Sequence, residues 1–201
     1  MTLMAGRRPA LDRIRAERIV AILRRVPDVD STVEELVAGG IRIVEVTLDS
    51  DDALRTITRL RERRDVTVLA GTVRTPGDAE AAAAAGAEAC VAPALVPETV
   101  ERCHDLGVPA IPGAFTPSEI ERAHALGAGL VKLFPARLAG PGYIRDVLMP
   151  LAGVELMASG GIDESNAQAF LDGGAAAVGV GSALTGVADV RSAARRLLGA
   201  V

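Results

Sequence analysis

Two charged residues stand in short apolar runs where a charge is not expected. Lys132 lies in residues 129–135 (GLVKLFP), and Glu45 lies in residues 43–48 (IVEVTL). Both runs are typical of parallel strands that are covered on both faces. Burying an ammonium group without a partner is costly, so the neutral amine is the cheaper state. A neutral buried amine is a nucleophile, and a carboxylate beside it could transfer protons.

A purely structural interpretation of the two residues is also open. The stem of Lys132 could be buried while its head reaches water at the end of the strand, or the lysine could form a structural ion pair with Glu45. A dry ion pair is seldom worth its desolvation, however. A lysine and a glutamate inside one apolar core are therefore more typical of a working site.

Length and composition favour one α/β domain. The 201 residues are 49% hydrophobic and 2% aromatic, and no linker-like boundary divides them. We expect a single domain over residues 1–201, with a short N-terminal helix at 9–17 before the first strand. The net charge is −4 and the basic residues are dispersed, which predicts no nucleic-acid partner. No apolar run or N-terminal segment is typical of a membrane span or a signal peptide, which favours the cytoplasm and no membrane partner.

One unit recurs along the chain, consisting of a helix, a glycine and a short apolar strand. Gly86, Gly107 and Gly127 are 21 and 20 residues apart, while Gly40 to Gly86 and Gly127 to Gly174 span 46 and 47 residues, or two units each. The predicted strands lie at residues 18–23, 41–46, 66–70, 90–93, 108–111, 130–133, 154–158 and 175–178. Eight such strands predict a (β/α)8 TIM barrel, with an open doubly wound sheet as the alternative.

In such barrels the chemistry lies at the carboxyl ends of the strands. After the first strand, Arg24 could grip a substrate carboxylate, whereas Arg25 is expected to be solvated. Thr72, after the third strand, could contribute its hydroxyl to the site, or it could simply belong to a tight turn before the next helix. Pro93 is expected to shape the rim after the fourth strand. Phe134, beside Lys132, is expected to pack against a substrate, with an ordinary core position as the alternative.

The last two strands are followed by glycine-rich turns. These contain Ser159, Gly160 and Gly161 after the seventh strand, and Gly181 and Ser182 after the eighth. Loops at these two places form the usual phosphate site of the fold, so a phosphate site is predicted here. The two histidines, His104 and His124, lie in helical segments away from the strand ends. We therefore expect no catalytic metal and no cofactor.

A buried lysine, a nearby carboxylate and a phosphate site point to carbanion chemistry on a phosphorylated keto compound. The amine would condense with the ketone to give an iminium ion, which accepts electrons when a neighbouring C–C bond breaks. The carboxylate would move the protons. These are the steps of a class I aldolase.

The chain resembles the family of 2-keto-3-deoxy-6-phosphogluconate (KDPG) and 4-hydroxy-2-oxoglutarate aldolases. The segments that carry the resemblance are 44–47 (VEVT), 70–72 (AGT), 112–113 (PG), 131–136 (VKLFPA), 159–162 (SGGI) and 179–182 (GVGS). The resemblance implies a pyruvate Schiff base on Lys132, acid–base work by Glu45 and a homotrimer. It also implies a hydroxyl from Thr72 on the pyruvate side, a pocket lined by Pro93 and Phe134, and phosphate held near Gly160, Gly161 and Ser182.

One position departs from the family pattern. Members specific for KDPG carry an arginine after the VEVTL segment, where this chain has Asp49. Either Arg24 takes over the binding of the pyruvate carboxylate or the substrate differs. Residues 140–145 (GPGYIR) look more like the branch of the family that cleaves the C4 epimer of KDPG. Expected products are pyruvate and glyceraldehyde 3-phosphate. Alternatives are a 4-hydroxy-2-oxoglutarate aldolase, decarboxylation of a 2-keto acid such as oxaloacetate, and a non-catalytic barrel that binds sugar phosphates.

Overall fold

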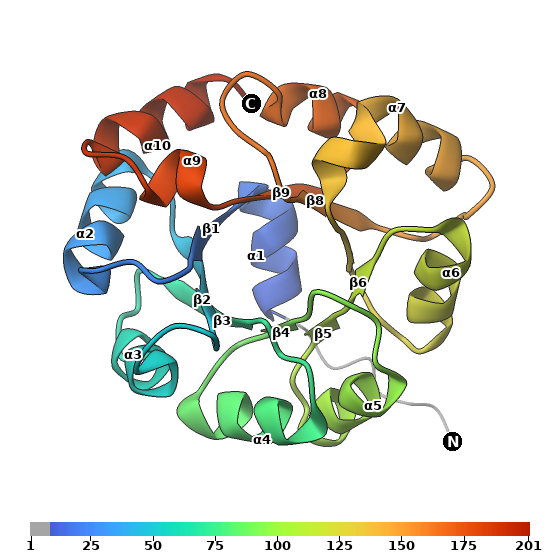
Figure 1. Ribbon diagram of the computed structural model, residues 1–201, viewed down its shortest axis with the longest axis horizontal. Helices are drawn as coiled ribbons and strands as arrows, with labels where there is room; N and C mark the ends of the chain where they lie inside the picture. The colour runs from blue at the N-terminus through green and yellow to red at the C-terminus, as the bar shows by residue number, and fades with distance from the viewer. Residues whose placement is uncertain (1–8) are drawn as a thin grey trace.

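Parallel strands form a barrel, and the helices surround it (Figure 1). The computed structural model describes residues 9–201. Neighbouring strands follow the order β5-β4-β3-β2-β1-β9-β8-β7-β6, and every pairing is parallel. The strands are β1 (Ile19–Leu23), β2 (Ile43–Thr47), β3 (Thr67–Gly71), β4 (Cys90–Val91), β5 (Ala110–Ile111), β6 (Gly113–Ala114), β7 (Val131–Leu133), β8 (Leu156–Ser159) and β9 (Ala177–Val180).

The fifth strand, predicted at residues 108–111, is β5, and a second short segment, β6, follows it after Pro112. Proline has no N–H to donate to a strand ladder, so it interrupts the regular pairing. β5 pairs with β4 on one side, and β6 pairs with β7 on the other. The Pro112 carbonyl still accepts a hydrogen bond from the Lys132 amide at 2.9 Å. The segment thus closes the barrel, which confirms the predicted (β/α)8 fold and excludes the open sheet.

The helices alternate with the strands along the chain. They are α1 (Pro9–Glu17), α2 (Val29–Gly39), α3 (Ala53–Leu60), α4 (Pro76–Ala85), α5 (Pro97–Asp105), α6 (Pro117–Ala125), α7 (Ala136–Leu148), α8 (Ala167–Asp172), α9 (Ser182–Thr185) and α10 (Val190–Gly199). Local sequence explains several boundaries. Thr75 and Thr116 each cap a helix that starts with proline, through reciprocal bonds to Asp78 and Glu119. Within the described residues, no helix has the length and hydropathy that a membrane span requires.

Strand alternation divides the apolar side chains between two cores. Val44 and Val46 of β2 face outward and pack with the surrounding helices, whereas Ile43 faces the barrel interior. The interior core also contains Leu11 and Ile14 of α1, both essentially inaccessible. In Figure 1, α1 lies across the centre of the barrel. This helix therefore closes one end of the barrel with apolar side chains and leaves the other end for polar groups.

Several strand ends differ from their predicted positions. Ser159 was expected in a turn, and Gly179 follows the strand predicted at residues 175–178. In the structure they are residues of β8 and β9, where they are paired in register. A Cβ atom added to Gly179 would lie 2.9 Å from Ser159 Oγ, so this glycine permits close packing inside the sheet. β4 in turn ends at Val91, two residues before Pro93.

Candidate active site

Lys132 and Glu45 meet inside the barrel, although 87 residues separate them in the sequence. Lys132 Nζ lies 3.4 Å from Glu45 Oε1, and the two residues are only 6% and 0% exposed. Strand alternation accounts for the meeting, because β2 and β7 both direct these side chains into the barrel. The 3.4 Å separation is at the long end of the hydrogen-bond range and still allows a proton to pass between the amine and the carboxylate.

Glu45 has a second oxygen that makes no hydrogen bond. Within residues 9–201, Oε2 is buried and has no donor. A buried acceptor left in this state is uncommon in folded proteins and is typical of a functional site. The carboxylate fits beside β3 only because position 71 is glycine, since a Cβ atom there would lie 2.3 Å from Oε1. Gly71 is thus part of the site, although its sequence context predicted only space or a turn.

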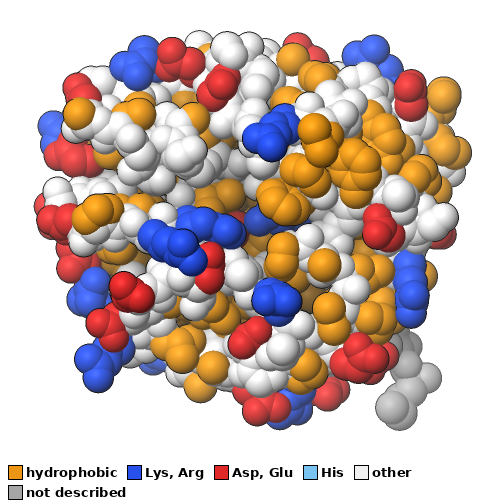
Figure 2. Space-filling model, in the orientation of Figure 1, with side chains coloured by type: hydrophobic (Ala, Val, Ile, Leu, Met, Phe, Trp, Pro, Cys, Tyr) orange, Lys and Arg blue, Asp and Glu red, His pale blue; other side chains and the backbone are white. Residues whose placement is uncertain are grey.

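The main cavity has a volume of about 580 Å³ and opens at the carboxyl ends of β1, β7, β8 and β9. It brings together most of the predicted site. Its lining includes Lys132, Arg24, Phe134, Ser159, Gly160, Gly161, Gly181 and Ser182. Figure 2 shows Lys and Arg side chains gathered at the central hollow of this face. An anionic molecule would therefore meet basic groups at the cavity mouth and the amine deeper inside.

The two glycine-rich turns lie on the same cavity. Gly160 and Gly161 have φ values of 92° and 79°, in the region that favours glycine, and Ser182 is the first residue of α9. A Cβ atom at Gly160 would lie 3.0 Å from the Phe134 ring, and one at Gly161 would lie 2.7 Å from Arg137, so both positions need glycine for space as well as for conformation. The lining also contains Asp163 and Thr185, which the sequence did not single out. Asp163 could have been found from its place just after the Gly-Gly turn.

Phe134 lies between two cavities. It lines the main cavity and also an adjacent one of about 380 Å³, in which Pro93 takes part. Phe134 is 38% exposed, and the centroid of its ring lies 5.7 Å from Lys132 Nζ, which is within cation–π range. Pro93 is not among the residues that line the main cavity. The structure thus places Phe134 beside the amine and Pro93 in the adjacent cavity that Phe134 also lines.

Thr72 is linked to the site through Arg24. Arg24 Nη2 donates to Thr72 Oγ1 at 3.1 Å, while Nη1 lies 3.5 Å from Asp49 Oδ2. Burial by itself would raise the pKa of Asp49, but a hydrogen bond with Thr47 and the charges of Arg24 and Arg25 outweigh it and hold the pKa below its ordinary value. Asp49 is therefore an anion at neutral pH. Arg25, expected to be solvated, is 75% exposed in its side chain and weakly paired with Asp49 at 3.9 Å.

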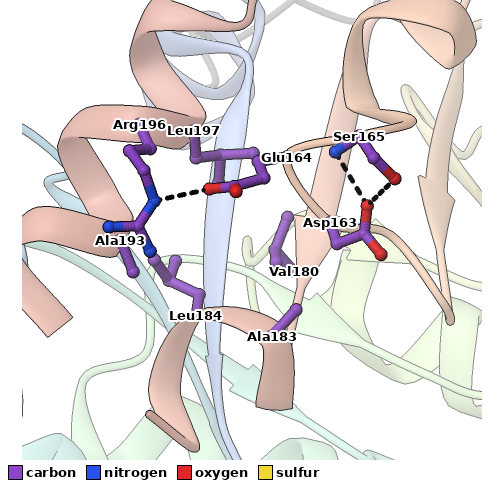
Figure 3. Close-up of a pocket in the computed structure, with 9 residues that line it drawn as sticks. All are labelled: Asp163, Glu164, Ser165, Val180, Ala183, Leu184, Ala193, Arg196 and Leu197. Carbon is purple, nitrogen blue, oxygen red and sulfur yellow. Dashed lines mark hydrogen bonds and ion pairs between the residues drawn. The ribbon is translucent and has the colours of Figure 1, made fainter. Parts of the chain in front are cut away.

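A smaller cavity of about 320 Å³ lies beside the main one, and both are lined by Asp163 and Ala183 (Figure 3). Its charged groups already have partners. Arg196 Nε donates to Glu164 at 2.8 Å, and Asp163 accepts bonds from the Ser165 amide and hydroxyl. The main cavity, which contains the buried amine, is therefore the stronger candidate for chemistry. No group of three or more potential metal ligands is found in residues 9–201.

A buried amine that faces a carboxylate inside a (β/α)8 barrel is typical of the Schiff-base aldolases, a class of carbon–carbon lyases. A family model described as KDPG and KHG aldolase matches residues 11–196. The chain belongs to this family.

Three known proteins illustrate the relationship. The chain is 39% identical over 159 residues to a 2-dehydro-3-deoxy-phosphogluconate aldolase of Treponema pallidum, covering 78% of this chain and 75% of the relative. It is 30% identical over 171 residues to a 2-dehydro-3-deoxy-6-phosphogalactonate aldolase of Escherichia coli, covering 83% of each. A solved KDPG aldolase of Legionella pneumophila, with pyruvate captured as a covalent carbinolamine, superposes with a TM-score of 0.81 at 26% identity over 93% of each chain. The comparisons thus include both branches.

Proposed function

We propose that this enzyme cleaves a 2-keto-3-deoxy-6-phospho sugar acid, either KDPG or its C4 epimer, to pyruvate and glyceraldehyde 3-phosphate. The observation that carries the proposal is the buried contact of 3.4 Å between Glu45 Oε1 and Lys132 Nζ, whose side chain lines the cavity with the glycine turns. The names of the relatives from Treponema pallidum and Escherichia coli support this substrate class.

The geometry supports a defined sequence of steps. Lys132 Nζ attacks the C2 ketone, and loss of water from the carbinolamine gives an iminium ion. Glu45 removes the proton of the C4 hydroxyl, the C3–C4 bond breaks, and its electron pair enters the iminium to form an enamine. Glyceraldehyde 3-phosphate leaves, the enamine takes a proton at C3, and water releases pyruvate from the lysine.

We assign the binding groups by charge. Arg24 would bind the carboxylate next to the reacting ketone, and Thr72 would hold the same end of the substrate. Phe134 would cover the pyruvate portion, with Pro93 supporting the ring from the neighbouring cavity. The phosphate would bind at Ser159, Gly160, Gly161, Gly181 and Ser182, where the turns expose backbone N–H groups. These roles stay predictions, as does a cytoplasmic location.

Borohydride trapping tests the chemistry directly. Incubation with pyruvate and borohydride should leave a reduced adduct on Lys132, which is the only lysine in the sequence, so no other side-chain amine competes. Lys132→Met keeps the apolar stem and should abolish both adduct and turnover while circular dichroism stays unchanged. Wild-type protein that forms no adduct would refute the Schiff-base route.

The substrate is tested by product analysis. Release of glyceraldehyde 3-phosphate should be measured from each of the two C4 epimers, and pyruvate release from 4-hydroxy-2-oxoglutarate and from oxaloacetate. We expect one or both phosphorylated epimers to have the highest kcat/KM. A higher value for either unphosphorylated acid would contradict the proposed substrate, although not the Schiff base.

We also infer that the chain assembles as a homotrimer, as the resemblance predicts. Leu138 on α7 and Met149 at its end are 69% and 81% exposed. Figure 2 shows hydrophobic side chains gathered over the region of α7, and a second copy of the chain would cover them. Sedimentation should give the mass of three chains, and a Leu138→Asp/Met149→Asp variant should dissociate. A monomeric wild type, or a variant that remains trimeric, would refute this interface.

A further inference from the structure

Two arginines and one aspartate meet where β1 and β2 end, at the edge of the main cavity. Arg24 and Arg25 follow β1 and line that cavity, and Asp49 lies just after β2. Asp49 Oδ2 lies 3.5 Å from Arg24 Nη1 and 3.9 Å from Arg25 Nη2. The cluster of these three residues carries a net positive charge, so an acid at position 49 does not make this edge repel anions.

Arg24 is held from two sides within this cluster. Asp49 contacts one terminal nitrogen of the guanidinium, and the Thr72 hydroxyl accepts a hydrogen bond from the other at 3.1 Å. The Arg24 side chain remains 53% exposed, whereas that of Asp49 is 30% exposed. The arginine therefore faces the cavity, and the aspartate stands behind it.

Hydrogen bonds also fix the backbone and the side chains around this cluster. Arg25 donates its backbone N–H to Ser50 Oγ at 2.8 Å, and Ser50 Oγ lies 3.0 Å from Thr47 Oγ1. Arg25 and Thr72 have φ values of 52° and 60°, which is unusual for residues with a side chain. Strained backbone of this kind persists where surrounding contacts enforce it, and it is concentrated at functional sites.

We propose that Asp49 is a positioning residue, which orients the Arg24 guanidinium so that it binds the carboxylate of the 2-keto acid condensed with Lys132. The inference rests on the proposed function, in which Arg24 binds that carboxylate. It assigns a role to the residue that departs from the family pattern. In this chain the cations nearest to Asp49 stand at the end of β1, and the acid after β2 contacts both of them.

Steady-state kinetics with the preferred epimer test the role of Asp49. Arg24→Ala should raise KM about 10- to 100-fold, because it removes a charged partner of the substrate. Asp49→Asn should raise KM about three- to five-fold with kcat changed less than about two-fold, as expected for a partly exposed ion pair that acts through another residue. Asp49→Glu should restore most of the affinity.

Asp51→Asn is the matched control. This acid lies two residues further along the same loop, is exposed, and forms no ion pair with any residue that the structure describes. Its removal changes the net charge equally, so KM should stay within about two-fold of wild type at moderate salt. Thermal midpoints of all variants should agree, which separates positioning from loss of fold.

A double-mutant cycle gives the decisive result. In the Arg24→Ala background, Asp49→Asn should leave KM unchanged or lower it, because no guanidinium remains to be positioned. An equal rise of KM in both backgrounds would overturn the proposal. So would a change in epimer preference at unchanged KM for the favoured epimer, which would place Asp49 at the C4 hydroxyl. Absence of a borohydride adduct in wild type would refute the proposed function instead.

Discussion

Substituting Gly71 by alanine should displace the Glu45 carboxylate, the proposed acid–base group, without a direct contact with Lys132, the proposed nucleophile. The added Cβ atom would lie 2.3 Å from Glu45 Oε1, 2.7 Å from Cγ and 2.8 Å from Cδ. Because real Cβ contacts essentially never fall below 3.0 Å, the Oε1 atom must move by at least 0.7 Å. All three atoms are too close, so rotation of the carboxylate alone cannot relieve the clash.

We expect this displacement of the Glu45 carboxylate to lower kcat. Misplacing a reacting group by about 1 Å can cost about 100-fold in rate, so we expect Gly71→Ala to lower kcat by about 30- to 100-fold. Formation of the borohydride adduct with pyruvate should persist, since Lys132 is unchanged. Gly71 has no positive φ, so the backbone accepts alanine without strain.

Gly77→Ala is the matched control for this substitution. A Cβ atom at Gly77 would meet only Thr75 Oγ1, at 3.8 Å, which is ordinary contact. Its kcat should equal that of wild type. If Gly71→Ala also retained kcat within about three-fold, the position of Glu45 would not control the proton transfers, and the assignment of Glu45 as the acid–base group would be wrong.

Two further predictions concern stability. Ile14→Ala should lower the free energy of unfolding by about 2 to 5 kcal/mol, because Ile14 is completely buried in the interior core and its removal leaves a cavity. The measurement is urea unfolding. A loss below about 0.5 kcal/mol would show that α1 does not seal the barrel. Glu119→Gln should cost about 0.3 to 1 kcal/mol at pH 7, where the carboxylate lies at the N-terminus of α6. Hydrogen bonds from the Thr116 and Phe115 amides and the Thr116 hydroxyl hold the pKa of Glu119 below its ordinary value of 4.5. The stabilisation by the Glu119 carboxylate is therefore complete above pH 4.5 and is lost as the pH falls through the folded-state pKa. The difference in unfolding free energy between wild type and Glu119→Gln should shrink at about pH 3. An unchanged difference would contradict the charge-based account.

The sequence alone determined the repeating pattern and the identity of the unusual residues. Helix, glycine and strand recur at a spacing of about 20 residues, and this local pattern follows from burial periodicity and from glycine at helix ends. Gly86, for example, ends α4 with φ of 94°. Period two along a strand also puts Glu45 on the same face as Ile43, because alternation is a local property. The structure then shows that Ile43 belongs to the interior core.

The tertiary structure decided how those residues meet. The distance between Lys132 and Glu45 depends on barrel closure through the segment around Pro112, and the room for Glu45 depends on Gly71 of a third strand. The contact between Asp49 and Arg24 joins two loops that no periodicity relates. Patterns along the chain record which face is buried, whereas the partner of a side chain across the barrel is set by strand register and by packing between segments far apart in sequence.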